Sequence, residues 1–482
     1  MKKSTLRIIA AILVVLSLLA FYFLYIADIS IIIRVVAAFA IVIAVGLVLQ
    51  KFFGLKGSWS LYMVGSKRGL NEIEKISKKY GKFWDAMAMW GLTLGFGLLA
   101  YPLMKGKIDK RVFAFGMISL AVIMFLVLPY ISYGFQFINI SQIQNAVSAS
   151  KSSSTGLTPL NYIIYGATII AGFSGSIIVS LFINTESILY SIVLFLQNPS
   201  LGAAASGITS QVPGVAPIIP GIDIPLIAGI ISLVILLMVH EFSHGILARK
   251  AKVKLKSIGL LLFGFIPIGG YVEPDEKMVE KLDNVKQTKI FAAGISANFI
   301  AMLVFFVLLL LIIVYVAPSA YQYKVVVAGT YAGYPANGIL KSGMQVLEWN
   351  GHAIKNISSL TEASATDRPN STVTVVTNTG TYSIKTVADP QNATRGLIGV
   401  TLNYEPVIAT PYARIVYFLY TVFALSMLLN FLVAVVNLLP LPGLDGWRIY
   451  FANIKNERIT KTLGAFVILM IIINILPWLF YL

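Results

Sequence analysis

The chain has 482 residues, of which 57% are hydrophobic and only 12% are charged, and its formal net charge is +17. Ordinary soluble domains are about a quarter charged, so this composition excludes a conventional soluble protein. The basic residues gather between apolar runs, as they do in cytoplasmic loops of membrane proteins, which argues against nucleic-acid binding. The chain contains no cysteine, so any metal site must use His, Asp or Glu.

The first 200 residues hold several apolar segments that reach the roughly 20 residues needed to cross a bilayer. A polar loop is expected at 136–160, and a shorter apolar segment follows at 187–197. The sequence assigns no role to this N-terminal membrane region, 1–200. In chain order, its expected membrane helices are residues 8–26, 31–49 (joined to the first at Asp28), 83–104, 112–135 and 162–183.

Charge predicts the side on which the loops lie. Lys and Arg are concentrated in residues 51–82, as in cytoplasmic loops, whereas 201–223 contains neither and is expected outside. An odd number of crossings must therefore separate these two segments. One candidate does not cross, and the sequence leaves open whether it is 83–104, which has basic residues at both ends, or the short segment 187–197.

A histidine motif closes the apolar run 225–248. His240 and His244 are four residues apart, so on a helix they lie on one face and can share a metal ion. Glu241 completes the HExxH zinc pattern, in which the two His bind the metal and the Glu is the general base. The alternative is a pair of buried histidines satisfied by neighbours, but a helix in lipid rarely carries three ionisable groups in five residues without a use for them. Basic residues at 249–256 predict that this end is cytoplasmic.

The apolar segment 257–272 contains glycines and a proline that disfavour a helix. Irregular backbone at membrane depth is tolerated only where protein buries it or where it lines a cavity. We therefore expect a short β-like re-entrant segment beside the motif, with Gly269 and Gly270 lining the active site.

A charged loop is expected at 273–288 and a further span at 290–316. Near the start of this span, Gly294 permits close helix packing, and Asn298 places an amide near the membrane interior. A hydrogen bond to a neighbouring helix is the alternative role for Asn298.

Residues 317–409 have the composition of a soluble domain, and the predicted topology places them outside the membrane. A small helix and a strand are expected within 338–347, a turn within 349–352, and His352 is expected to be a surface residue. Further strands are predicted at 324–328, 372–377 and 382–387.

The predicted span 412–436 returns to the cytoplasmic side and ends in 437–446, where two prolines and two glycines break the helix. Asp445 lies on this irregular segment and is the only Asp or Glu between residues 414 and 456. A catalytic zinc needs three protein ligands, and without cysteine the third must be a carboxylate. Asp445 is therefore the predicted third ligand; the alternatives are a helix cap or a partner of Arg448. A last span follows at 462–482.

Three motifs occur in order around the inserted domain: His240-Glu241-x-x-His244, Gly294-x-x-x-Asn298 and the segment from Asn437 to Gly446 that holds Pro440, Pro442 and Asp445. Together they resemble the site-2 protease family of intramembrane zinc metalloproteases, over roughly residues 220–482. The resemblance implies one Zn²⁺ per chain on His240, His244 and Asp445, with Glu241 as the base and Asn298 and Asn437 lining the site. It implies cleavage of single-span membrane proteins, usually after another protease has removed an external part.

The inserted domain is similar to a PDZ domain, through Tyr334-Pro335-Ala336, then 340–343, then Trp349-Asn350-Gly351. Two roles stay open for it: binding a peptide, or excluding substrates with bulky external parts.

We therefore expect a polytopic α-helical protein of the cell membrane with an inserted small α+β (PDZ-like) extracytoplasmic domain, and with the N-terminus and zinc site toward the cytoplasm. A protease that cuts at the membrane surface would take a later Glu as third ligand, and none is suitably placed. A non-catalytic scaffold would need neither Glu241 nor Asp445, and a metal transporter would carry ionisable residues along several spans. The expected parts are 1–200, 201–316 (catalytic core, first part), 317–409 (inserted domain) and 410–482 (catalytic core, second part).

Overall fold

The computed structural model describes residues 3–26, 30–55, 57–65, 67–139, 159–197, 218–390, 392–408, 410–454 and 456–477. They belong to two compact units: Met1–Leu308 together with Thr421–Leu482, and Leu309–Tyr420. The second unit contains the predicted inserted domain, 317–409. The junction predicted at Asp28, and most of the loops predicted at 136–160 and 201–223, lie outside the described residues.

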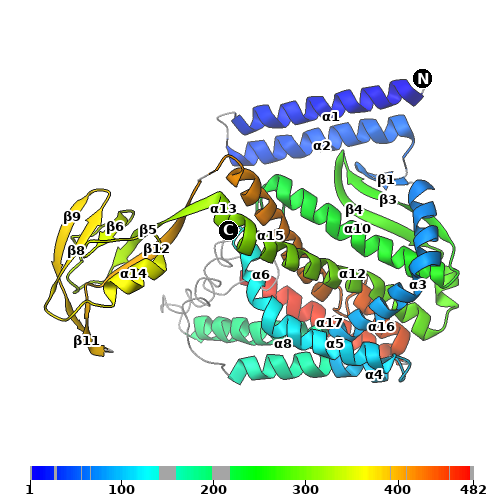
Figure 1. Cartoon of the computed structure of the whole chain (residues 1–482). Helices are drawn as coiled ribbons and strands as arrows, with labels where there is room; N and C mark the ends of the chain where they lie inside the picture. The colour runs from blue at the N-terminus through cyan, green and yellow to red at the C-terminus, as the bar shows by residue number, and fades with distance from the viewer. Residues whose placement is uncertain are drawn as a thin grey trace. The chain divides into compact units, whose positions relative to one another are not determined.

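The first unit is helical, and eight helices among the described residues are long and apolar enough to cross a membrane. Helices α1 (Lys3–Ile26) and α2 (Ile31–Phe53) lie side by side (Figure 1). Large apolar side chains on them are exposed, such as Phe23 at 62% and Val36 at 63%. A soluble fold would bury such a surface, whereas lipid covers it in a membrane protein.

Helix α3 (Lys67–Phe96) begins well before the predicted segment 83–104 and breaks at Gly97, where φ is +54°. The chain continues through a short turn, Gly97–Leu99, and α4 (Ala100–Leu103). Asp283, just before α12, has a lowered pKa, mainly because Lys286 donates a hydrogen bond to its carboxylate, and the charge of Lys107 adds to this effect. The start of α3 also meets this side of the unit, since Glu74 pairs with Arg249 of α10. The segment Gly69–Leu103 is itself long and apolar enough to cross a membrane, so the choice between a span and a re-entrant segment stays a prediction.

Helix α5 (Lys110–Val122) starts at the cap residue Asp109, whose carboxylate accepts hydrogen bonds from the first backbone N–H groups. A π-helical turn, Ile123–Val127, joins it to α6 (Leu128–Phe135). Pro129 follows this turn and cannot donate to a carbonyl one turn back, so the helix widens there instead of breaking.

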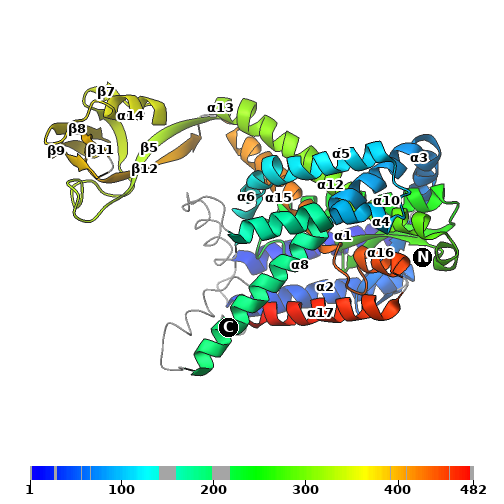
Figure 2. The same cartoon turned by 90° about the horizontal axis from the view of Figure 1, so that it is seen from below.

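Helix α8 (Pro159–Gln197) is bent at Ala171 and Gly172, where Gly172 has φ +61°. Figure 2 shows its two arms diverging from this bend. A Cβ on Gly172 would lie 2.3 Å from the carbonyl carbon of Gly95, so the bend of α8 rests against the end of α3. The expectation of a separate short segment at 187–197 is wrong, because these residues are the last turns of α8.

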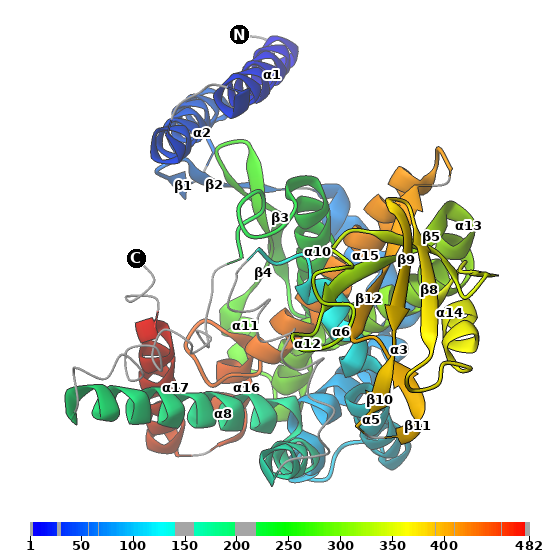
Figure 3. The same cartoon turned by 90° about the vertical axis from the view of Figure 1, so that its left-hand side faces the viewer.

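A four-stranded antiparallel sheet joins distant parts of the chain. Strands β3 (Leu255–Phe263) and β4 (Ile266–Pro274) form the β-like segment expected at 257–272. Strand β2 (Leu61–Gly65), preceded by β1 (Gly57–Ser58), adds to the far side of β3, giving the order β1-β2-β3-β4. In Figure 3, β4 lies toward α10 (Leu226–Lys250), the helix that carries the histidine motif.

The charged segment expected at 273–288 as a loop is partly helical. Its residues form the short α11 (Glu276–Glu280) and the first turn of α12 (Asn284–Leu311), six residues before the predicted start at 290. The carboxylate of Asp275 caps α11 by accepting a hydrogen bond from Met278 N–H, a local signal that the charge pattern obscured.

The C-terminal helices follow the prediction more closely. Helix α15 (Ala413–Val436) matches the predicted span, and an irregular segment then leads to α16 (Asp445–Asn453) and α17 (Glu457–Ile475). Asp445 is the first residue of α16 rather than part of the irregular segment itself. Ser426 of α15 donates to Ser232 of α10 in the buried interface between these helices.

The second unit is built on an antiparallel sheet with the order β12-β5-β6-β8-β9, and β7 pairs with β6. Its apolar core includes Trp349 and Val375. The indole N–H of Trp349 donates to the carboxylate of Asp367, and burial raises the pKa of Asp367. The strands are β5 (Tyr321–Thr330), β6 (Gln345–Trp349), β7 (His352–Ala353), β8 (Thr372–Thr377), β9 (Gly380–Lys385), β10 (Val387–Asp389), β11 (Asn392–Leu397) and β12 (Val400–Ile408).

The small helix expected within 338–347 is absent from these residues, which form turns before β6. Gly338 and Gly343 have φ of +77° and +89°, a conformation that ends any helix. A helix forms later instead, as α14 (Ile357–Ser364), and Asn356 caps it reciprocally with Ser359. His352 is exposed, as expected.

Candidate metal centre

Helix α10 presents two histidines on one face. Its residues are apolar up to the motif, and Arg249 and Lys250 in its last turn complement the negative end of the helix dipole. The Nε2 atoms of His240 and His244 are 3.2 Å apart, and the ring centroids are 4.8 Å apart. Both imidazoles thus point to one place, as the i and i+4 spacing predicts.

Asp445 reaches the same place from the C-terminal part of the chain, at the start of α16. The backbone N–H of Gly446 donates to the carbonyl of Asn437 at 2.6 Å, which closes the irregular segment into a loop. A Cβ on Gly446 would lie 2.5 Å from the backbone of Leu438, so a side chain there would open this loop. Asp445 Oδ2 lies 3.2 Å from Nε2 of His240 and 3.2 Å from Nε2 of His244.

These three atoms suit a metal ion. Ligands at 2.0–2.2 Å in a tetrahedral site are about 3.3–3.6 Å apart, close to the 3.2 Å separations here. Asp445 Oδ2 is buried and accepts no hydrogen bond, so a cation would satisfy it. Among the described residues this is the one group of three His, Asp or Glu side chains whose ligand atoms lie together.

Gly294 of α12 keeps this space open. A Cβ at this position would lie 2.4 Å from Nε2 of His244 and 2.7 Å from Nε2 of His240. The close packing expected of Gly294 is therefore packing against the ligand imidazoles.

The outer nitrogens of both imidazoles face α12. His244 Nδ1 lies 2.7 Å from the carbonyl oxygen of Ile290, and His240 Nδ1 lies 3.2 Å from Nδ2 of the buried Asn298. Such partners fix the orientation and tautomer of metal-binding histidines. Sequence reasoning found Asn298 but missed Ile290, which acts through a backbone oxygen that no side-chain pattern reveals.

Glu241 faces the sheet. Its Oε2 accepts a hydrogen bond from the backbone N–H of Val272 in β4 at 3.1 Å. Gly270 lies against it, since a Cβ there would be 3.4 Å from Glu241 Cγ. A Cβ on Gly269 would instead meet Leu261 of β3, so only Gly270 of the two predicted glycines is brought to the motif. The side-chain amide of Asn437 donates to the Val433 carbonyl one turn back, and its backbone contacts the Asp445 segment.

The sequence profile of Peptidase family M50 matches residues 228–477, more than half of the chain, and the match includes all three residues of the candidate centre. The chain belongs to Peptidase family M50. This confirms the resemblance to the site-2 protease family. The family consists of membrane-embedded zinc metalloproteases, which agrees with the eight apolar helices and the His-His-Asp group.

The chain is also similar to an uncharacterized protein of Methanocaldococcus jannaschii, with 30% identity over 237 residues. The matched region covers 49% of this chain and 60% of that protein. The first 227 residues of the chain lie outside the family match.

Proposed function

We propose that this protein is an intramembrane zinc protease that hydrolyses peptide bonds within or near the membrane span of single-span proteins, in regulated intramembrane proteolysis. The observation that carries the proposal is the triangle of His240 Nε2, His244 Nε2 and Asp445 Oδ2, with sides of 3.2 Å, beside Glu241. Membership of Peptidase family M50 supports the metalloprotease chemistry.

His240, His244 and Asp445 would hold the zinc ion, which when bound polarises the scissile carbonyl and acidifies a water. Each imidazole would offer Nε2 to the ion and carry its proton on Nδ1. His244 Nδ1–H donates to the carbonyl of Ile290. His240 Nδ1–H needs an acceptor, and the Oδ1 of Asn298, buried and without a partner, supplies it when the amide is turned over.

Glu241 is the proposed general base. It takes a proton from the attacking water as the carbon–oxygen bond forms, and delivers it to the leaving amine as the carbon–nitrogen bond breaks. The hydrogen bond from Val272 N–H orients the carboxylate, so the base is fixed to β4 as well as to α10.

The substrate must unwind before attack, because a helix in lipid shields its peptide bonds with its own hydrogen bonds. Strand β4 is the outer strand of the sheet and touches the base at Val272. We propose that the unwound substrate pairs with β4 and so runs past Glu241. Proline at Ile268 or Tyr271 should lower cleavage, with Tyr271→Ala as the control that keeps the backbone N–H; unchanged cleavage by the proline variants rules the pairing out.

We place the metal centre toward the cytoplasm and the unit Leu309–Tyr420 outside. Basic residues directly after α10 and in 51–82 support this orientation. We propose further that α3–α4 does not cross and that α8 turns back at its bend at Gly172 (Figure 2), which would leave α5–α6 as the single crossing between 51–82 and 201–223. The outer unit is proposed as a PDZ-like filter that admits only substrates already trimmed by another protease.

The decisive experiment uses purified full chain in detergent with a model single-span substrate, with and without a chelator, beside Glu241→Gln. Zinc content is measured on the same samples. The proposal is supported if wild type cleaves the substrate, Glu241→Gln does not, and both bind zinc. Zinc near one per chain without cleavage in trimmed and untrimmed substrates favours a scaffold. Absence of zinc refutes the ligand assignment.

A further inference from the structure

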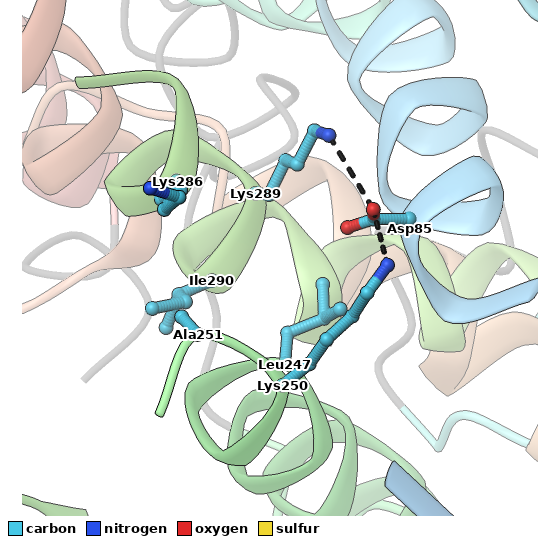
Figure 4. A pocket seen from close by; sticks show the side chains of 7 residues that line it. All are labelled: Asp85, Leu247, Lys250, Ala251, Lys286, Lys289 and Ile290. Carbon is cyan, nitrogen blue, oxygen red and sulfur yellow. Dashed lines mark hydrogen bonds and ion pairs between the residues drawn. The ribbon is translucent and has the colours of Figure 1, made fainter. Parts of the chain in front are cut away.

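Helix α3 contributes one carboxylate that meets a lysine from α10, which carries the two histidines, and a lysine from α12, which packs against their rings. Asp85 Oδ2 accepts a hydrogen bond from Lys250 Nζ at the end of α10 and lies 3.6 Å from Lys289 Nζ in α12 (Figure 4). The Asp85 side chain is 30% exposed and that of Lys289 only 20%. Asp85 lies outside the family match, which starts at residue 228.

A cavity of about 130 Å³ lies beside the ion pairs of Asp85. Asp85 and both of its lysine partners line it (Figure 4). The cavity is lined by Asp85, Leu247, Lys250, Ala251, Lys286, Lys289 and Ile290.

The two lysines lie close in sequence to His244 and to Ile290, the residue whose carbonyl oxygen contacts the His244 ring. Lys289 directly precedes Ile290, whose carbonyl oxygen lies 2.7 Å from His244 Nδ1. Lys250 lies six residues after His244 on α10, fewer than two helical turns away. Asp85 thus links α10, which carries His244, to the part of α12 whose backbone carbonyl orients the His244 ring.

The N-terminal region also supports Asp445. Ser174 of α8 lies with its Oγ 2.7 Å from the hydroxyl of Tyr450, in the helix that Asp445 begins. Phe96, the last residue of α3, packs edge-on against the Tyr450 ring at 5.4 Å between centroids. A Cβ on Gly95 would lie 2.5 Å from Leu438, so α3 also touches the loop before Asp445.

We propose that α3 and α8 are positioning elements of the metal centre. Asp85 holds His244 against its backbone acceptor, and Ser174 holds α16 and with it Asp445. The inference rests on the proposed zinc site and gives a role to the N-terminal region, which shares one compact unit with the motif helices.

Zinc affinity, measured by competition with a chelator on the full chain in detergent, tests Asp85 without relying on activity. In Asp85→Asn the two lysines lose their shared anion, and the affinity should fall by up to about tenfold, the lower end of the effect of removing a direct partner of a metal ligand. Asp85→Glu should restore most of it. Glu72→Gln is the matched control, because Glu72 is an exposed carboxylate of α3 paired with Lys75, and its affinity should be unchanged.

The proposed role of Ser174 in positioning α16 is tested with Tyr450→Phe, which removes the Tyr450 hydroxyl and keeps the ring against Phe96. Ser174→Ala and Tyr450→Phe should each lower zinc affinity, and the double variant should lose no more than the larger single loss, because both remove one hydrogen bond.

Two results overturn the inference and differ from each other. A lower melting temperature of Asp85→Asn with wild-type zinc affinity shows that Asp85 only stabilises the fold. Absence of zinc from wild type refutes the proposed centre itself, and this inference with it.

Discussion

Replacing Gly294 by alanine tests the metal centre at its tightest point. The added Cβ would lie 2.4 Å from His244 Nε2 and 2.6 and 2.7 Å from Cε1 and Nε2 of His240. Ordinary van der Waals contact begins near 3.4 Å, so the His244 nitrogen must retreat by 1.0 Å, the difference between 3.4 and 2.4 Å. The ring has little freedom to do so, because its Nδ1 is held at 2.7 Å from Ile290 O.

A retreat of this size breaks a metal bond, since zinc–nitrogen bonds are about 2.0–2.1 Å long. We expect Gly294→Ala to lower zinc affinity by at least about 100-fold, or about 2.7 kcal/mol, with a parallel loss of cleavage. Competition with a chelator, and zinc content after dialysis, measure the effect on purified protein.

Gly166→Ala is the matched control, also a glycine of an apolar helix, where a Cβ would meet nothing within 4 Å. Its zinc affinity should equal wild type, and its stability should rise by about 0.5–1 kcal/mol. One zinc per chain at undiminished affinity in Gly294→Ala would show that the space between the imidazoles is not where the metal binds.

Three further outcomes are expected. Asp445→Asn keeps the size of the side chain but replaces the anionic ligand with a neutral amide, so zinc content after dialysis should fall well below one per chain; full retention contradicts its role as third ligand. Chelation should abolish cleavage by wild type and added zinc should restore it, whereas activity that survives complete zinc removal excludes the metalloprotease mechanism. Asp367→Ala leaves the Trp349 N–H without its acceptor and should destabilise the unit Leu309–Tyr420 by about 1–3 kcal/mol, seen as faster hydrogen exchange in residues 321–408; unchanged exchange would show that water satisfies the N–H equally well.

The metal centre was predictable from sequence because its chemistry has a local signature. His240, Glu241 and His244 are separated by helix spacing, and the lack of cysteine leaves a carboxylate as third ligand. Asp445 could be predicted as this ligand by elimination, because it is the only Asp or Glu between residues 414 and 456. Ile290 and Val272 contribute only backbone atoms to the site, so residue identity carries no sign of them.

Contacts between segments far apart in the sequence were harder to predict. Strand β2 pairs with β3 across nearly 200 residues, and its own five residues carry no sign of this distant partner. The bend in α8 depends on Gly172 resting against Gly95, a contact between separate helices. The role of Asp85 has no local sign in the sequence, because its lysine partners in α10 and α12 lie more than 160 residues later.

The position of the helix in the inserted domain has a local signal in the sequence. The glycines at 338 and 343 require positive φ and argue against the helix expected there. The true helix, α14, carries the reciprocal cap between Asn356 and Ser359, a recognisable helix-start signal. Where the pattern is local, closer attention to turn chemistry would have corrected the prediction.

The division of the three candidate ligands between distant segments has a consequence for biosynthesis. His240 and His244 emerge from the ribosome 201 to 205 residues before Asp445. At translation rates of about 5–20 residues per second, this interval lasts about 10–40 s. During that time the nascent chain holds only two of the three candidate ligands, so the proposed cleavage cannot begin until the segment that carries Asp445 has been made.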